Sequence, residues 1–263
     1  MKIINKVNLL NGLILTFAVF PITPNRLKGL PVILLFIGAL FFCKKREVNW
    51  KWLFVNSSLF LIYTISVIYS NDYLVSIKNL ETSLSILALP LIFFALLPRF
   101  KISNKIKRVF IKTFIGSTTV FSIYSFVYIV LRNSSLNYLW STDKYRSIII
   151  DMPLIGQHPI YASIFLALSV IFFVYLFKQK LFKNYKQFFF FLILTSVNLV
   201  FLLFLSSKGA ILALFIIIFF LLIFETTKKI YKLLIIVTFI CSLITLFIYN
   251  RRMNELINTQ TYE

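Results

Sequence analysis

Residues 188–205 read FFFFLILTSVNLVFLLFL, an apolar run without a single charged side chain. A bilayer core of about 30 Å takes roughly 17–25 apolar residues of helix to cross, and this run has that length. Lipid offers no water to satisfy backbone polar groups, so a continuous apolar run predicts a helix. A transmembrane β-barrel would need alternating apolar and polar positions, which are missing here. The run therefore predicts a transmembrane helix.

Similar apolar runs recur along the whole chain. The chain is 60% hydrophobic and has 31 phenylalanines in 263 residues, whereas an ordinary soluble domain is about 45–50% apolar. This composition excludes an ordinary soluble domain. We expect one integral membrane domain over residues 1–263, an all-α polytopic bundle of about nine transmembrane spans. The expected spans are residues 7–20, 30–42, 52–69, 80–97, 109–131, 160–177, 188–205, 210–224 and 233–249.

The net charge of +20 arises from short basic clusters between these runs. Nucleic-acid binding would need the basic residues on a folded soluble surface, so we expect membrane lipid, and no nucleic acid, as a partner. Nineteen of the 28 lysines and arginines fall on one set of alternate connections. By the positive-inside rule this predicts a cytoplasmic amino terminus and an outward carboxyl terminus. One histidine and two separated cysteines predict no metal site.

The stretch Gly156-Gln157-His158-Pro159-Ile160-Tyr161 contains the only histidine and follows a polar loop of about residues 132–157. Proline is best tolerated in the first turn of a helix, so Pro159 predicts His158 at a helix start. Tyr161 lies in the same first turn. A second polar insertion, Ser206-Ser207-Lys208-Gly209, separates the runs 188–205 and 210–224. The predicted topology puts both insertions on the extracytoplasmic face.

Each of these polar residues also has a simpler interpretation. In the simpler interpretation, His158 does no more than cap a helix, and Lys208 extends its side chain to the lipid headgroups. Arg132 and Arg146, predicted on the same face, can meet lipid phosphate. The residues alone leave these alternatives open.

Taken together, the two motifs resemble those of the O-antigen ligase and polymerase family, bacterial inner-membrane glycosyltransferases of lipopolysaccharide and related glycan assembly. In many members a His-Pro-x-Tyr motif begins a span, and a Ser-Arg-Gly or Ser-Ser-Lys/Arg-x turn precedes a later one. The motif resemblance covers about residues 148–224, and the predicted topology is similar over the whole chain. Lys208 stands where the family often has arginine.

The resemblance implies a multi-pass enzyme of the bacterial inner membrane that transfers or polymerises a polyprenyl-diphosphate-linked glycan. The acceptor would be a glycan or a lipid, and the reaction would use no cofactor. The resemblance also implies that this chain corresponds to the amino-terminal two-thirds of a family member. The chain would stop, at Glu263, where the family's large periplasmic loop begins, and a carboxyl-terminal fragment would complete the enzyme.

For the site, the resemblance implies two chemical roles. His158 would take the proton of the acceptor hydroxyl, and Lys208 with Ser207 would bind the departing diphosphate. Five residues would bind substrate around the histidine. These are Lys208 and Ser207 at the turn, Tyr161 beside the sugar or the histidine, and Arg146 and Arg132 as supplementary cations.

Two other classes of membrane protein stay open. A transporter or flippase of glycan lipids needs polar residues buried at mid-membrane, and the mid-span polar residues here are neutral. They are Ser57, Ser58, Thr64, Ser66, Thr195, Ser196 and Asn198. A non-catalytic assembly subunit would need only the spans. A membrane protease or acyltransferase is disfavoured, because His158 has no Ser or Asp partner in a suitable context.

Overall fold

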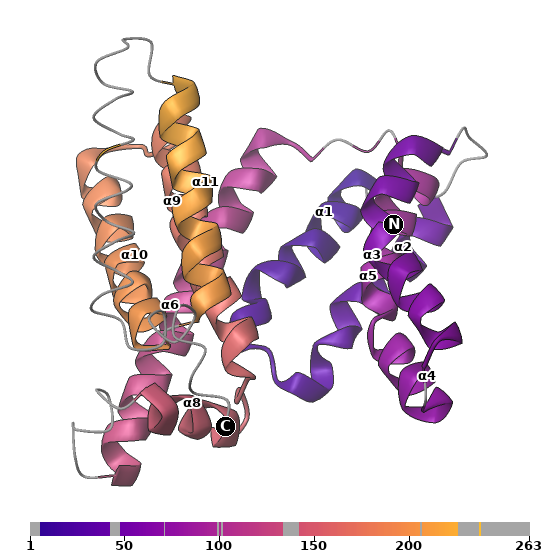
Figure 1. Cartoon of the computed structure of the whole chain (residues 1–263). Helices are drawn as coiled ribbons and strands as arrows, with labels where there is room; N and C mark the ends of the chain where they lie inside the picture. The colour runs from indigo at the N-terminus through magenta and orange to yellow at the C-terminus, as the bar shows by residue number, and fades with distance from the viewer. Residues whose placement is uncertain are drawn as a thin grey trace, which may run out of the picture. The chain divides into compact units, whose positions relative to one another are not determined.

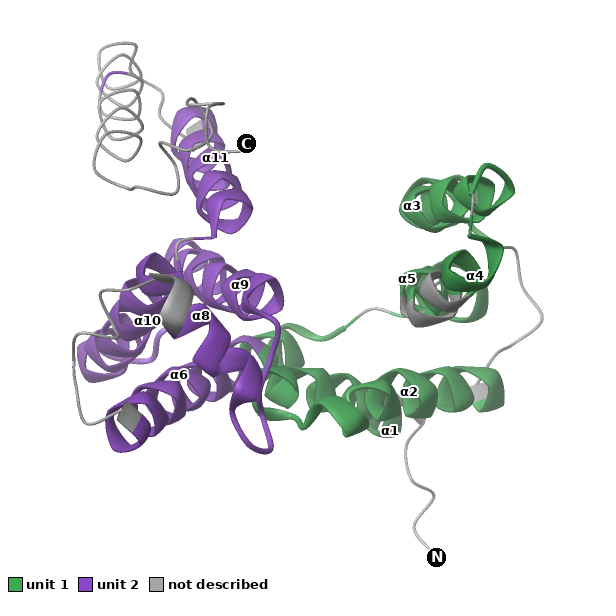
Figure 2. Cartoon of the chain, turned by 60° about the horizontal axis from the view of Figure 1, so that its bottom comes forward, with its two compact units in different colours: residues 1–110 green, residues 111–263 purple. Residues whose placement is uncertain are grey.

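The computed structural model describes residues 6–42, 48–70, 72–98, 100, 102–133, 142–205, 207–225 and 237, and the regular structure in this part of the chain is helical (Figure 1). The chain divides into two compact units. Unit 1 comprises Met1–Phe110 and unit 2 comprises Ile111–Glu263 (Figure 2). The candidate site residues named above all belong to unit 2.

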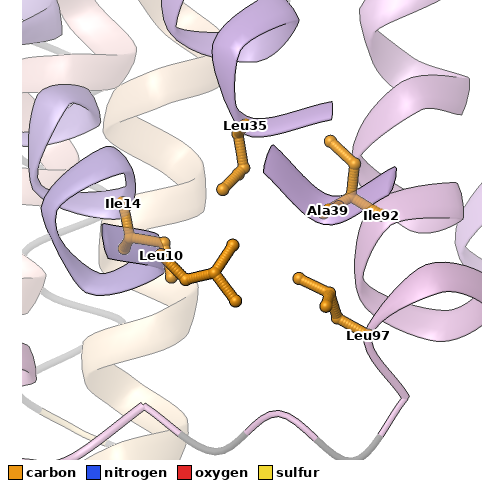
Figure 3. Close-up of a cluster of buried hydrophobic side chains, with 6 residues drawn as sticks. All are labelled: Leu10, Ile14, Leu35, Ala39, Ile92 and Leu97. Carbon is orange, nitrogen blue, oxygen red and sulfur yellow. The ribbon is translucent and has the colours of Figure 1, made fainter. Parts of the chain in front are cut away.

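Unit 1 is built on a small apolar core. Its helices are α1 (Lys6–Thr16), α2 (Gly29–Phe42), α3 (Trp50–Ile68), α4 (Tyr73–Thr82) and α5 (Leu84–Pro90), with the short segments η1 (Phe17–Ile22), η2 (Asn25–Leu27) and η3 (Leu91–Leu96). Helix α1 packs against α2, and α3 packs against α5 (Figure 2). The buried side chains between α1, α2 and η3 are Leu10, Ile14, Leu35, Ala39, Ile92 and Leu97 (Figure 3).

Unit 2 contains the longer helices. They are α6 (Asn104–Asn133, in unit 2 from residue 111), α8 (Thr142–Asp151), α9 (Pro159–Lys178), α10 (Tyr185–Leu205) and α11 (Lys208–Glu225). Helices α9 and α10 are joined by a short connection and pack along each other as a hairpin (Figure 1). Because the two have nearly equal lengths, the start of α9 and the end of α10 lie at the same end of the unit. Helix α11 begins directly after α10, so it starts there too. We call this the His158 end.

The interior of unit 2 contains polar contacts between helices. Ser122 on α6 donates its Oγ hydrogen to Oδ1 of Asn198 on α10 at 3.1 Å, and Asn198 is fully buried. Thr119 Oγ1 lies 3.4 Å from the Leu194 carbonyl oxygen, so a second contact joins the same two helices. Hydrogen bonds between helices hold register where both helices are surrounded by apolar groups. The faces of α6 and α10 that meet are thus specified by polar atoms.

Four helices are long and apolar enough to cross a membrane. They are Trp50–Ile68, Asn104–Arg132, Pro159–Lys178 and Tyr185–Leu205. Three shorter apolar segments, Asn8–Ile22, Ile86–Leu96 and Lys208–Phe224, coincide with expected spans. The expected span at residues 233–249 lies outside the described residues apart from Val237. The chain is therefore an all-helical protein with four candidate membrane-spanning helices in its described part.

The apolar run at residues 80–97 does not form one helix. Helix α4 ends at Thr82, α5 runs only to Pro90, and a π-helical segment, η3, follows it. Proline has no N–H to donate to the preceding turn, which favours a change of helix type at this point. Hydropathy alone does not register such breaks, because every residue around Pro90 is apolar.

Lys28 offers a pH-dependent test of unit 1. It lies between η2 and α2, where its Nζ donates to Asn25 Oδ1 at 2.7 Å, and partial burial lowers its pKa to about 8. A lowered pKa leaves more of the amine neutral at a given pH, so acylation of Lys28 should rise with a midpoint near pH 8. The reference is Nα-acetyl-lysine, whose amine titrates near pH 10.4. Pulse acylation followed by peptide mass spectrometry measures both, and identical pH profiles would contradict the burial effect.

Candidate functional site

His158 is the residue that caps the start of α9. Its backbone is extended, with φ −61° and ψ 133°, and Pro159 occupies the first turn of the helix. The Nδ1 atom of His158 accepts the Ile160 N–H at 3.4 Å, which satisfies one of the free donors at the helix start. Ser163 Oγ donates to the Pro159 carbonyl oxygen at 2.7 Å and further orders this turn. The cap thus holds the imidazole at the amino-terminal end of α9.

The cap also selects a tautomer of His158. A nitrogen that accepts a hydrogen bond carries no proton, so a neutral, capping imidazole has its proton on Nε2. Nε2–H then faces away from the helix as a hydrogen-bond donor. In this state His158 can donate to a sugar or phosphate oxygen. To take a proton, it must release the cap or change tautomer.

Tyr161 lies beside His158 on the first turn of α9. The two ring centroids are 6.0 Å apart, and the planes meet at 65° in an edge-to-face arrangement. Both side chains are exposed, Tyr161 with 61% of its surface. The pair therefore presents two polar aromatic edges at the His158 end.

A tight turn precedes His158 and depends on a glycine. The Gly156 N–H donates to the Met152 carbonyl oxygen at 3.1 Å, and the Gln157 N–H donates to the Ile149 carbonyl oxygen at 3.2 Å. A Cβ at position 156 would press against the Met152 carbonyl oxygen and lie 2.6 Å from the Ile150 carbonyl oxygen. Backbone oxygens cannot swing aside as a flexible side chain can. Only glycine fits this close approach to the end of α8.

Replacing Gly156 by alanine should therefore destabilise the protein by about 1–3 kcal/mol, the usual cost of overpacking a closed site. The matched control is Gly116→Ala, because a Cβ at Gly116 has no neighbour within 4 Å. Alanine is also the better helix former by up to about 1 kcal/mol. Thermal unfolding in detergent should show a lower Tm for Gly156→Ala and an unchanged or higher Tm for Gly116→Ala. Equal Tm values for the two variants would contradict the close approach.

The segment expected as a polar loop contains a helix, so that expectation is wrong. Helix α8 forms because Tyr145, Ile148 and Ile149 follow helical spacing and are buried, as is Met152 directly after the helix. Tyr145 has 1% of its surface exposed and packs against Phe201 and Phe204 of α10, with centroids 6.3 and 6.1 Å away. Burial raises the pKa of this phenol, so it stays protonated. Helix α8 is thereby fastened to the end of α10.

Arg146, the next residue, reaches the α10–α11 turn. Its Nη1 donates to the Leu205 carbonyl oxygen at 3.0 Å, which satisfies one of the free acceptors at the end of α10. Partial burial lowers the pKa of this guanidinium, a group that nevertheless stays charged in proteins. A fixed positive charge therefore lies at the last residue of α10.

The same turn carries Ser207 and Lys208. Ser207 is buried, and its carbonyl oxygen accepts the Ile211 N–H at 3.0 Å, so it stands at the start of α11. Lys208 is the first residue of that helix and is half-buried. No acidic residue occurs in the sequence between Asp151 and Glu225. One turn thus combines three sources of positive charge: the Arg146 guanidinium, the Lys208 ammonium and the dipole at the start of α11.

Arg132 lies at the end of α6 and has a different environment. Its Nη1 donates to the Tyr128 hydroxyl at 3.1 Å, and its guanidinium carbon lies 5.8 Å from the centre of that ring. Tyr124, one turn earlier, stacks with Tyr128 and donates to the Pro153 carbonyl oxygen at 3.2 Å. This row connects α6 to the turn before His158. The sequence interpretation missed both tyrosines, although their spacing of four residues from each other and from Arg132 was a usable signal.

The structure therefore gathers the predicted residues in smaller groups. Arg146 meets the turn of Ser207 and Lys208, and His158 meets Tyr161. Arg132 is engaged by Tyr128. In the described ranges, no group of three or more His, Cys, Asp or Glu side chains is arranged to hold a metal ion. Searches against protein-family models, curated proteins and solved structures found no match to this chain.

Proposed function

We propose that this chain takes part in glycosyl transfer from a polyprenyl-diphosphate-linked glycan at the extracytoplasmic face of a bacterial inner membrane. The observation that supports it most is the hydrogen bond from Arg146 to the Leu205 carbonyl oxygen. It brings a guanidinium to the turn that already carries Lys208 and the start of α11. Two cations and a helix start suit a diphosphate better than a single charge does.

The proposed reaction is a substitution at the anomeric carbon. The acceptor hydroxyl oxygen forms the new glycosidic bond while the bond from that carbon to the diphosphate oxygen breaks. The polyprenyl diphosphate leaves with the electron pair of the broken bond, and the cations at the α10–α11 turn stabilise the growing negative charge. The hydroxyl proton must pass to a base.

His158 is the proposed base, with a condition that its cap imposes. While Nδ1 accepts the Ile160 N–H, Nε2 is protonated and orients the substrate by donating a hydrogen bond. Substrate binding that displaces the cap frees Nδ1, and the imidazole can then accept the hydroxyl proton. Tyr161, in edge contact with His158, orients the ring or the sugar. Arg132 would act further out, since Tyr128 already engages it.

The proposal includes about nine crossings, a cytoplasmic amino terminus and an outward carboxyl terminus. Reporter tags at residues 101–107 and 178–186 should then be active in the cytoplasm, and a tag after residue 263 should be active outside. The reason is the excess of lysine and arginine on one set of connections. Paired fusions to alkaline phosphatase and green fluorescent protein measure each position. A cytoplasmic carboxyl terminus would remove His158 and Lys208 from the working face.

A second candidate function is a flippase for the same glycan lipids. Asn198 and Thr195 favour it, because both are buried in the middle part of α10. Asn198 Nδ2 and Thr195 Oγ1 also have no hydrogen-bond partner within the described structure. Buried polar atoms within a span often mark a transport path. The hydrogen bond that Asn198 Oδ1 accepts from Ser122 of α6 gives Asn198 an equally good structural role.

One experiment separates the two functions. Cells that lack the chain should accumulate lipid-linked glycan, and its membrane side can be probed with an impermeant sugar-modifying enzyme. Accumulation on the outer leaflet, relieved when the chain is restored, supports transfer. Accumulation on the inner leaflet supports a flippase. Unchanged amounts of lipid-linked glycan would leave neither function standing.

A further inference from the structure

The connection between α9 and α10 is a tightly built hairpin. At the end of α9, the Leu181 N–H donates to the Leu176 carbonyl oxygen and the Lys180 N–H donates to the Phe177 carbonyl oxygen, each at 3.0 Å. These two bonds form a Schellman motif, with Lys180 in the left-handed region at φ 48°. Glycine usually takes that position, because a Cβ there is strained. Lysine at position 180 therefore adds a charge to the turn but strains the backbone.

The start of α10 is closed just as firmly. The Gln187 N–H donates to Asn184 Oδ1 at 2.9 Å, and Gln187 Oε1 accepts the Lys183 N–H at 2.9 Å. This exchange is a variant of the capping box, in which two free helix donors are satisfied reciprocally. Residues 179–184 are thus held by hydrogen bonds from both flanking helices.

An aromatic cluster packs against the connection between α9 and α10. The Phe182 ring lies 5.7 Å from Phe173 and 5.5 Å from Phe188. Lys112 of α6 places its Nζ 5.9 Å from the Phe182 ring centre and 5.7 Å from that of Phe191. The side chain at the centre of the connection is therefore packed, and the lysines on either side of it stand at defined positions.

Those lysines form a strongly charged surface, which we call the hairpin lysines: Lys178, Lys180, Lys183 and Lys186. Lys180, Lys183 and Lys186 are exposed, and Lys178 is half-buried. The first turn of α10 contains no acidic residue, and none occurs in the sequence between Asp151 and Glu225. Lys183 and Lys186 lie near the positive end of the α10 dipole, where cations are disfavoured. These positive charges therefore favour the binding of an anion from outside the chain.

The position of the hairpin indicates which anion. Its two helices are both candidate membrane spans, ending at Lys178 and beginning at Tyr185. A connection of this length keeps the lysines within a few residues of the membrane surface. Tyr185, Phe177 and Phe189 around it are exposed by 84, 59 and 57%, and aromatic side chains favour the headgroup level. Lipid phosphate is the anion concentrated at that depth.

We propose that the hairpin lysines form a binding surface for the phosphate headgroups of acidic phospholipids. The surface lies at the end of unit 2 opposite His158, and it does not depend on the proposed glycosyl transfer. Three exposed ammonium groups on a hydrogen-bonded hairpin bind anionic headgroups with little loss of backbone freedom. The lipid tails lie along the exposed phenylalanines of α9 and α10.

The test uses the full chain, purified in detergent and stripped of lipid. It is titrated with phosphatidylglycerol or phosphatidylcholine, and native mass spectrometry counts the bound lipids. Wild type should bind phosphatidylglycerol in preference to phosphatidylcholine. The variant Lys180→Gln/Lys183→Gln/Lys186→Gln should bind phosphatidylglycerol about tenfold or more weakly, since each lysine near an anionic surface contributes measurably. The all-arginine variant at the same three positions should keep the binding.

The matched control removes three exposed charges elsewhere, as Lys51→Gln/Lys105→Gln/Lys107→Gln. This control should bind phosphatidylglycerol like wild type. A similar loss in the control would show a general charge effect and overturn the proposal, as would undiminished binding by the hairpin variant. Competition by millimolar sodium phosphate that abolishes lipid binding would overturn it as well, by assigning the surface to a soluble anion. A Tm measured on every variant confirms that the compared proteins are folded.

Discussion

Replacing Lys208 by alanine should reduce glycan transfer by about 10²–10³-fold, while the amount of chain in the membrane stays near that of wild type. The loss of one preorganised electrostatic contact to a developing charge usually has an effect of this size. Lys208 is the first residue of α11, so its positive charge belongs to the positive end of that helix dipole. Arg146 is held on the Leu205 carbonyl oxygen, so it keeps contributing its own charge to the turn but does not restore the charge lost with the lysine.

Two variants sharpen this prediction. Lys208→Arg should retain much of the transfer, because it keeps the charge and can grip phosphate with two donors. Lys51→Ala, an exposed lysine of unit 1, is the control for general loss of charge and should transfer normally. Product formation is followed by gel electrophoresis of the glycan, and abundance by immunoblot. Normal transfer by Lys208→Ala at normal abundance would mean that the lysine only reaches for headgroups.

The second large effect is expected at His158. His158→Ala should lower transfer by about 10²-fold or more if the imidazole exchanges a proton with the acceptor hydroxyl. The same change removes a helix cap, which alone costs about 1 kcal/mol of stability. Transfer and Tm must therefore be measured on the same preparations, because only the first reports the chemistry.

His158→Asn separates the two roles. Asparagine is a strong helix cap, so it should restore the Tm that alanine loses. Its amide has no titrating nitrogen, so it should not restore transfer. If His158→Asn transfers as well as wild type, the residue acts only by capping α9 through the Ile160 N–H. In that case the proposed proton transfer must be assigned elsewhere.

The long helices of unit 2 were predictable because two local signals agree. The apolar run at residues 188–205 falls within α10, and Pro159 marks the first residue of α9. Proline restricts the backbone regardless of what packs around it, so a helix start beside it follows from sequence alone. The cap by His158 is a similarly local interaction.

Other features depend on contacts that no local pattern specifies. Helix α8 lies within a polar segment, and its apolar positions acquire meaning only once Phe201 and Phe204 cover Tyr145. The bond of Arg146 to the Leu205 carbonyl oxygen joins residues 59 positions apart. Such pairings follow from tertiary packing.

The link between α8 and α10 also has a consequence for biosynthesis. Membrane helices enter the bilayer in order, so Tyr145 and Arg146 emerge well before Phe201, Phe204 and Leu205 have been translated. Until α10 is inserted, the Tyr145 ring lacks its apolar cover and the guanidinium lacks its carbonyl acceptor. We therefore expect α8 to reach its final packing late, after α10 has been inserted. A nascent chain arrested before residue 205 should leave α8 open to protease, whereas a chain arrested beyond α11 should protect it.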